Sequence, residues 1–189
     1  MPAAPSTPLT LRARLRDGTA DSHDRIDRRM GALDLTTVDG LARLLGTHAL
    51  VQGLFGPVCG PDALDFREEL AADLASLGRD VPDWAEPPAL EPPHPLGYAY
   101  VIAGSQMGAR LLHRDWSRAT DPAVRSAGRY LSANLQGRAW PELMRRLKSM
   151  SGAGADADAA LATANRVFDA YGLAATQLGI ERIQDSGVS

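Results

Sequence analysis

The stretch GYAYVIAGSQMGARLLHRDW, residues 97–116, has apolar residues that recur at the three- and four-residue spacing of an α-helix. Three glycines, Gly97, Gly104 and Gly108, lie inside this pattern, although a glycine within a helix costs about 1 kcal/mol relative to alanine. Gly104 and Gly108 are four residues apart and therefore share one face of the helix. Such a bare face is typical either of close packing against another helix or of a ligand held near the backbone.

The rest of the chain repeats this helical pattern. Thr10 and Asp121 are suited to cap the start of a helix, and Gly78 lies where helices commonly end. Residues 79–95 contain six prolines and are predicted to form a long surface connection. The residues 151–155, SGAGA, are predicted to be a flexible link. The predicted helices cover residues 11–33, 37–56, 61–78, 96–118, 121–137, 138–150 and 156–179.

No segment alternates with the two-residue period of a strand. We therefore expect an all-α fold: a single-domain helical bundle of about seven helices. The domain is expected to span residues 10–183, with flexible tails at residues 1–9 and 184–189.

The composition agrees with a helical domain and limits the classes of partner that the protein is expected to bind. Apolar residues make up 44% of the chain and aromatic residues only 5%, whereas strands favour β-branched and aromatic side chains. A net charge of −3 gives no general attraction to nucleic acid. Cys59 is the only cysteine, which excludes an internal disulfide and a cysteine metal cluster. Without a signal-like or membrane-spanning apolar run, we expect a cytoplasmic protein with no membrane span.

Four histidines are candidates for chemistry. His94 lies in the proline-rich connection and is expected to be solvated. His48 and His113 lie in amphipathic helices, where a surface position or a hydrogen-bonded, partly buried position is expected. His23 differs, because it continues an apolar stripe formed by Leu15, Thr19, Ile26 and Met30.

The neighbours of His23 leave space for a large flat group, since Gly18, Thr19, Ala20 and Ser22 are all small. Asp27 follows one turn later and could fix the imidazole tautomer, which would make His23 a better metal donor. Arg16 could meet an anionic group at the mouth of such a pocket. A hydrogen-bonded core histidine and a metal ligand both remain open. A lone histidine cannot build a zinc site, but it is sufficient for haem, whose porphyrin supplies four nitrogens.

Four motifs in the same order resemble the haem oxygenase family, particularly its bacterial, phytochrome-associated branch. They are LRDGTADSHDRID (15–27), AADLASLG (71–78), YVIAGSQMGARLL (100–112) and RAWPELMRRL (138–147), followed by Phe168. The resemblance covers most of the chain. It implies a haem held between a helix that carries His23, the iron ligand, with Thr19 four residues before it, and a kinked helix over the opposite face.

The resemblance also implies roles for the remaining residues. Gly104 and Gly108 would leave room for dioxygen, and Phe168 would close the pocket wall. Arg16 and Arg145 would bind the haem propionates. Ser105 stands where some members carry an aspartate, so proton delivery would depend on Ser105, Gln106, backbone groups and water. The bacterial branch shares this serine, which favours membership of that branch.

The implied activity is that of a haem-degrading monooxygenase, with haem as both substrate and cofactor. It opens haem to biliverdin, carbon monoxide and ferrous iron with O2. The electrons would come from a separate reductase or ferredoxin, because the chain has no dinucleotide-binding fingerprint. A bacteriophytochrome could receive the biliverdin.

Two other readings stay open. The first is a non-catalytic haem carrier or sensor with the same fold, which the serine at position 105 favours. The second is a helical protein of similar fold that binds no haem, such as a phytochrome-interaction partner or a relative of thiamine-salvage hydrolases with Cys59 as its nucleophile.

Overall fold

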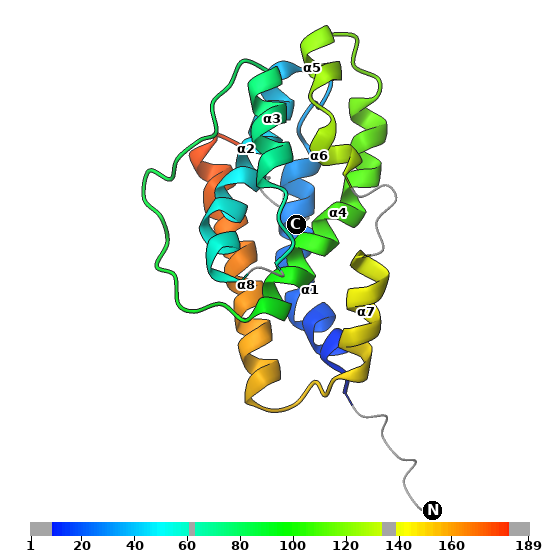
Figure 1. The fold of residues 1–189 in the computed structure, drawn as a ribbon, viewed down its shortest axis with the longest axis vertical. Coiled ribbons are helices and arrows are strands. Elements are labelled where there is room, and N and C mark those ends of the chain that lie inside the picture. The colour runs from blue at the N-terminus through cyan, green and yellow to red at the C-terminus, as the bar shows by residue number, and fades with distance from the viewer. Residues whose placement is uncertain (1–8, 61–62, 134–138, 182–189) are drawn as a thin grey trace, which may run out of the picture.

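The computed structural model describes residues 9–60, 63–133 and 139–181, which form a set of helices joined by loops (Figure 1). The described residues contain eight α-helices, one short 3-10 helix and no strand, which confirms the all-α prediction. The elements are α1 (Leu11–Gly31), α2 (Val38–Phe55), η1 (Gly56–Val58), α3 (Arg67–Ser76), α4 (Pro95–Trp116), α5 (Pro122–Ser126), α6 (Arg129–Ser132), α7 (Ala139–Ser149) and α8 (Ala155–Gln177). Of the two predicted tails, residues 1–8 and 184–189 lie outside the described residues.

Several helix ends form where the local sequence predicts them. Thr10 caps α1 by accepting a hydrogen bond from the Ala13 N–H at 3.2 Å. Asp121 caps α5 in the same way, at 2.8 Å from the Ala123 N–H. Gly78 follows α3 with a φ of +66°, the left-handed conformation that glycine adopts most easily. These ends depend only on neighbouring residues.

Two helix boundaries differ from the prediction. The helix predicted from residue 61 begins at Arg67 instead, because the Asp65 carboxylate binds the Arg67 N–H at 3.0 Å and the Gln52 side chain holds the Phe66 N–H. The helix predicted over residues 121–137 is interrupted, so that α5 and α6 are separate helices, while residues 134–137 of the predicted span lie outside the described residues.

The interruption between α5 and α6 has two causes in other helices. The carboxylate of Asp73 in α3 accepts the N–H groups of Arg129 and Tyr130, at 3.0 and 2.8 Å, and so starts a new helix there. A Cβ at Gly128 would lie 2.4 Å from the Trp116 ring, which leaves no room for a side chain at the break.

Helix α8 lies against α1, α2 and α4, and α7 covers the side formed by α1 and α4 (Figure 1). Alanines supply much of the buried face of α8, including Ala160 and Ala164. The contact with α4 is close: a Cβ added to Gly97 would lie 2.2 Å from the Ala160 carbonyl oxygen. The close-packing explanation of glycine therefore holds at Gly97.

The proline-rich connection runs along the surface as predicted, but it is fastened to the bundle. Trp84 donates its indole N–H to the Leu50 carbonyl at 3.0 Å, and the Gln177 side chain binds both Asp83 and Ala85. His94 was expected to be solvated, but its side chain is only 18% exposed. Its Nδ1 accepts the Leu96 N–H at the start of α4, and its Nε2 lies 3.0 Å from Asp156.

The predicted flexible link at residues 151–155 is also held in place. The Gly152 N–H donates to the Leu9 carbonyl at 2.7 Å, and Ser151 pairs with Thr10 as an isolated β-bridge. The N-terminal residues therefore anchor this link before α8 begins. Among the described helices, none is long and apolar enough to cross a membrane.

Candidate functional site

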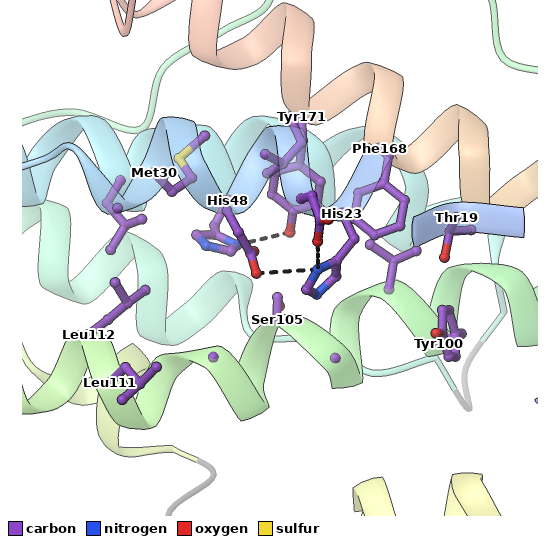
Figure 2. Close-up of a pocket in the computed structure, with 18 of the residues that line it drawn as sticks. Thr19, His23, Met30, His48, Tyr100, Ser105, Leu111, Leu112, Phe168 and Tyr171 are labelled. Carbon is purple, nitrogen blue, oxygen red and sulfur yellow. Dashed lines mark hydrogen bonds and ion pairs between the residues drawn. The ribbon is translucent and has the colours of Figure 1, made fainter. Parts of the chain in front are cut away.

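A cavity of about 760 Å³ lies between α1 and α4, with contributions from α2, α7 and α8 (Figure 2). Its volume falls in the range of about 300–1,000 Å³ that is usual for small-molecule and cofactor sites. The residues predicted from sequence that line it are Arg16, Thr19, His23, Asp27, Gly104, Ser105, Gly108 and Phe168. Arg145 is exposed on α7 and does not line the cavity.

His23 projects from α1 into this cavity. Its apolar stripe is buried as predicted, at Leu15, Ile26 and Met30, yet the His23 side chain is 49% exposed because the cavity opens beside it. Phe168 of α8 meets the imidazole edge-on, with ring centroids 5.9 Å apart (Figure 2). His23 is therefore a partly exposed histidine that lines the cavity, rather than a core histidine.

Two carboxylates face one nitrogen of His23. Nδ1 lies 3.3 Å from Asp27 and 3.9 Å from Asp24. Desolvation raises the pKa of Asp27, and the attraction of His23 opposes part of that rise. A carboxylate on Nδ1 fixes the orientation of the ring and leaves Nε2 as the donor atom for a ligand.

The opposite wall is the glycine face of α4. Apart from the neighbouring residues and nearby backbone of α4 itself, no described atom lies within 4 Å of the place where a Cβ on Gly108 would stand. At Gly104 the nearest atoms belong to the Trp140 ring, at 3.7 Å, which is ordinary van der Waals contact. These two glycines therefore leave open space, whereas Gly97 serves close packing.

A polar cluster that the sequence did not reveal adjoins the cavity, which two of its members, His48 and Tyr171, line. His48 of α2 lies 2.9 Å through Nδ1 from the hydroxyls of both Tyr130 and Tyr171. Burial lowers the pKa of His48 to about 3, so the imidazole is neutral. Burial raises the pKa of both tyrosines, and the neighbouring Ser105 side chain opposes part of each rise.

This cluster could not be found from local patterns. The expectation for His48 was a surface or hydrogen-bonded, partly buried position, and it is in fact almost completely buried, at 6% exposure. Its partners lie 82 and 123 residues further along the chain. Only the packing of α2, α6 and α8 brings the three side chains together.

Charged residues lie at the exposed rim of the cavity. Arg16 is 63% exposed and forms an ion pair with Asp17 at 2.8 Å. Arg114 and Asp115 line the cavity near the end of α4. Thr19 is buried and donates to the Leu15 carbonyl at 2.7 Å. The rim therefore offers two guanidinium groups, from Arg16 and Arg114, to an anionic ligand.

Cys59 does not show the properties of a nucleophile. It is buried outside the cavity lining, and burial raises the pKa of its thiol to about 11. The thiolate that a hydrolase would need is therefore disfavoured. The structure gives no support to a Cys59 hydrolase.

Comparison with known proteins adds no assignment to these observations. No protein-family model matches the chain, and no curated protein matches it with significance. In the described part of the chain, no three His, Cys, Asp or Glu side chains are grouped so that they could hold a metal ion.

Proposed function

We propose that this protein is a haem-degrading monooxygenase of the haem oxygenase type. The observation that carries the proposal is the pairing of two walls across one cavity. An oriented imidazole, His23, stands on α1, and the open glycine face at Gly104 and Gly108 stands on α4. The resemblance of the motifs that contain these residues supports the same function.

The donor set fits haem. Haem needs one axial ligand from the protein, and His23 offers one ring nitrogen while its other ring nitrogen faces carboxylates. Phe168 and Met30 provide apolar surface for a porphyrin, and the rim guanidinium groups of Arg16 and Arg114 suit its propionates. Arg145, which the resemblance suggested for the propionates, is replaced in this role by Arg114.

When bound, haem supplies the activation of dioxygen and is itself the substrate that is opened to biliverdin, carbon monoxide and ferrous iron. The protein's own residues bind, orient and supply protons. His23 holds the group, and Asp27 holds His23. Gly104 and Gly108 would leave space for the group on the α4 wall of the cavity. Ser105 presents a hydroxyl to the same space.

The proposal includes partners and a location. A separate reductase or ferredoxin delivers the electrons, and a bacteriophytochrome is a candidate recipient of biliverdin. The reaction takes place in the cytoplasm, where reduced electron carriers are present.

The ligand role of His23 is tested by titrating the purified protein with hemin and recording the Soret band. We expect His23→Ala to lose the histidine-ligated spectrum. His113→Ala is the matched control, because His113 packs on Trp116, with ring centroids 5.0 Å apart, outside the cavity lining. A His23→Ala spectrum identical to that of the wild type refutes the assignment.

Turnover distinguishes the enzyme from a haem carrier. One observation favours the carrier: Ser105 donates its proton to the Ile102 carbonyl at 2.8 Å, within its own helix. With a reductant and oxygen, the enzyme loses the Soret band and forms biliverdin, whose isomer is identified by chromatography. A carrier keeps the haem spectrum under the same conditions. Failure of the protein to bind hemin favours the hypothesis of a helical protein of similar fold that binds no haem.

A further inference from the structure

Helices α1 and α8 lie side by side and run parallel along one wall of the cavity (Figure 1). Their contacts advance in step along both helices, in the pairs Gly18 with Leu161, His23 with Phe168 and Ile26 with Gly172. If one helix slid along the other or turned about its axis, each of these contacts would change.

Arg29 ties the end of α1 to the end of α8. It donates to the Gly172 carbonyl at 2.9 Å, to the Ile180 carbonyl at 2.8 Å and to the Thr176 hydroxyl at 3.0 Å. Its side chain is buried, at 6% exposure, and it lies at the end of α8 where the helix dipole favours a cation. Because a guanidinium is planar and rigid, bonds to three acceptors fix the position and the angle of the two helices relative to each other.

A second tie, at the beginning of both helices, does not depend on Arg29. Arg14 donates to the Gly152 carbonyl at 3.0 Å and forms an ion pair with Asp158 in the first turn of α8. The contact of Gly18 with Leu161 lies near this beginning, whereas the contact of His23 with Phe168 lies nearer to Arg29 along both helices. The two contacts therefore report separately on the two ends of the packing.

The place of His23 in the cavity depends on where α1 lies. Asp24 and Asp27, whose carboxylates face its Nδ1, belong to the same helix and move with it. Among the ring contacts, hydrogen bonds and ion pairs of the described residues, the edge-on contact with Phe168, with centroids 5.9 Å apart, relates the His23 ring to another helix. Whatever holds α1 in place on α8 therefore also places the imidazole.

We propose that Arg29 is a positioning residue for His23: its bonds to the end of α8 hold α1 where the imidazole meets Phe168 inside the cavity. Arg29 does not itself line the cavity, so it acts on a ligand through His23. The inference rests on the proposed function for the group that His23 holds. It adds a residue that neither the apolar stripe of α1 nor the resemblance of the motifs indicated.

Arg43 offers a matched control, because it holds the same end of α8 from a different helix. From α2 it donates to the Gly179 carbonyl at 3.1 Å, and it pairs with Asp39 at 2.9 Å. Removing the Arg43 side chain loosens the end of α8 and leaves the tie between α8 and α1 in place. If Arg29 only stabilised the end of α8, Arg29→Met and Arg43→Met would have the same effect on His23.

The first test uses the haem-free protein, so that it does not depend on the proposed function. Nuclear Overhauser effects between protons measure the contact of His23 with Phe168 and the contact of Gly18 with Leu161. We expect Arg29→Met to weaken the first contact and to keep the second. Arg29→Lys, which keeps the charge but not the planar group, should weaken the first contact by less. Arg43→Met should keep both contacts.

Two results of this test overturn the proposal. One is an unchanged contact of His23 with Phe168 in both Arg29 variants, or in Arg29→Lys alone if Arg29→Met does not fold. The other is an equal weakening of that contact in Arg43→Met, because the effect would then not depend on the tie to α1.

The second test measures how firmly His23 holds hemin. Removing a residue that orients a metal ligand typically lowers metal affinity by about 10–100-fold. We therefore expect Arg29→Met to release hemin on the order of tenfold faster than the wild type, and to shift the iron–histidine stretching band of the ferrous complex. Arg29→Lys should lie between the two, and Arg43→Met should behave as the wild type does.

The outcomes separate the two proposals. If the wild type does not bind hemin, the proposed function fails, and the contacts measured in the haem-free protein still decide the role of Arg29. If the wild type binds hemin through His23 while the Arg29 variants keep the wild-type contact and release rate, the positioning role fails and the haem assignment stands.

Discussion

Replacing Gly104 and Gly108 with alanine should stabilise the protein while damaging its function. Apart from the neighbouring residues and nearby backbone of α4, a Cβ at Gly104 would meet only the Trp140 ring, at 3.7 Å, and one at Gly108 would meet no described atom within 4 Å. Neither substitution causes a clash, so the helix propensity of alanine decides the sign. Each should stabilise the fold by about 1 kcal/mol.

The double variant Gly104→Ala/Gly108→Ala should therefore gain about 2 kcal/mol in free energy of unfolding. For a domain of this size that corresponds to a rise in Tm of roughly 4–8 °C. Urea unfolding and thermal melting of the haem-free protein, followed by circular dichroism, measure both quantities. The same two methyl groups project into the cavity, so turnover of hemin should fall.

Gly97→Ala is the opposing control. Its Cβ would stand 2.2 Å from a carbonyl oxygen of α8, so backbone must move and stability should fall by about 1–3 kcal/mol. A double variant that is less stable than the wild type would show that Gly104 and Gly108 serve packing. A stabilised double variant with unchanged turnover would show that the open face has no role in the reaction.

Three further predictions concern charge and burial. The pKa of His48 falls from 6.5 to about 3 on folding, so between these pH values the His48 imidazole binds a proton only in the unfolded chain. The free energy of unfolding should therefore be highest above about pH 6.5 and fall by about 1.4 kcal/mol per pH unit below it. His48→Asn should reduce this slope, which urea titrations at several pH values measure. Burial raises the pKa of Asp73, so this group adds to the free energy of unfolding of the wild type as pH falls toward 4. Asp73→Asn should lower the free energy of unfolding by about 1–3 kcal/mol at pH 7. The loss should be larger at pH 4.5 than at pH 7. Arg29 donates to the carbonyls of Gly172 and Ile180, so Arg29→Met should speed amide hydrogen exchange selectively after residue 172, and uniform exchange would contradict this.

The parts of the fold that the sequence predicted depend on nearby residues. Thr10 and Asp121 cap their helices through N–H groups two or three residues away, so the signal is local. The break at Gly128 depends on Asp73 and Trp116, which belong to two other helices. No helical period within residues 121–137 could indicate those contacts, and the prediction of one continuous helix was wrong for that reason.

The residues of the candidate site differ in the same way in whether the sequence could predict them. His23 and the paired glycines were found because each belongs to a helical stripe that can be read on its own. Tyr130 and Tyr171 carry no local signal, since a buried tyrosine in a helix is usually part of the core. Arg145 was placed at the pocket by resemblance alone, and the packing of α7 leaves it exposed outside the cavity lining.

Helix α4 is fixed at two separated points. Gly97 lies against the α8 backbone, and near the other end the Trp116 indole donates to the Val124 carbonyl at 2.8 Å. The residues that face the cavity lie between these anchors. Each residue advances a helix by about 100°. If one residue were inserted or deleted between the anchors, both anchors could be kept only if Ser105 and the two glycines turned away from His23. The arrangement of side chains in the cavity therefore depends on how α4 is rotated about its own axis. That rotation is less sensitive to a change of side chain than to a change in the number of residues in the helix.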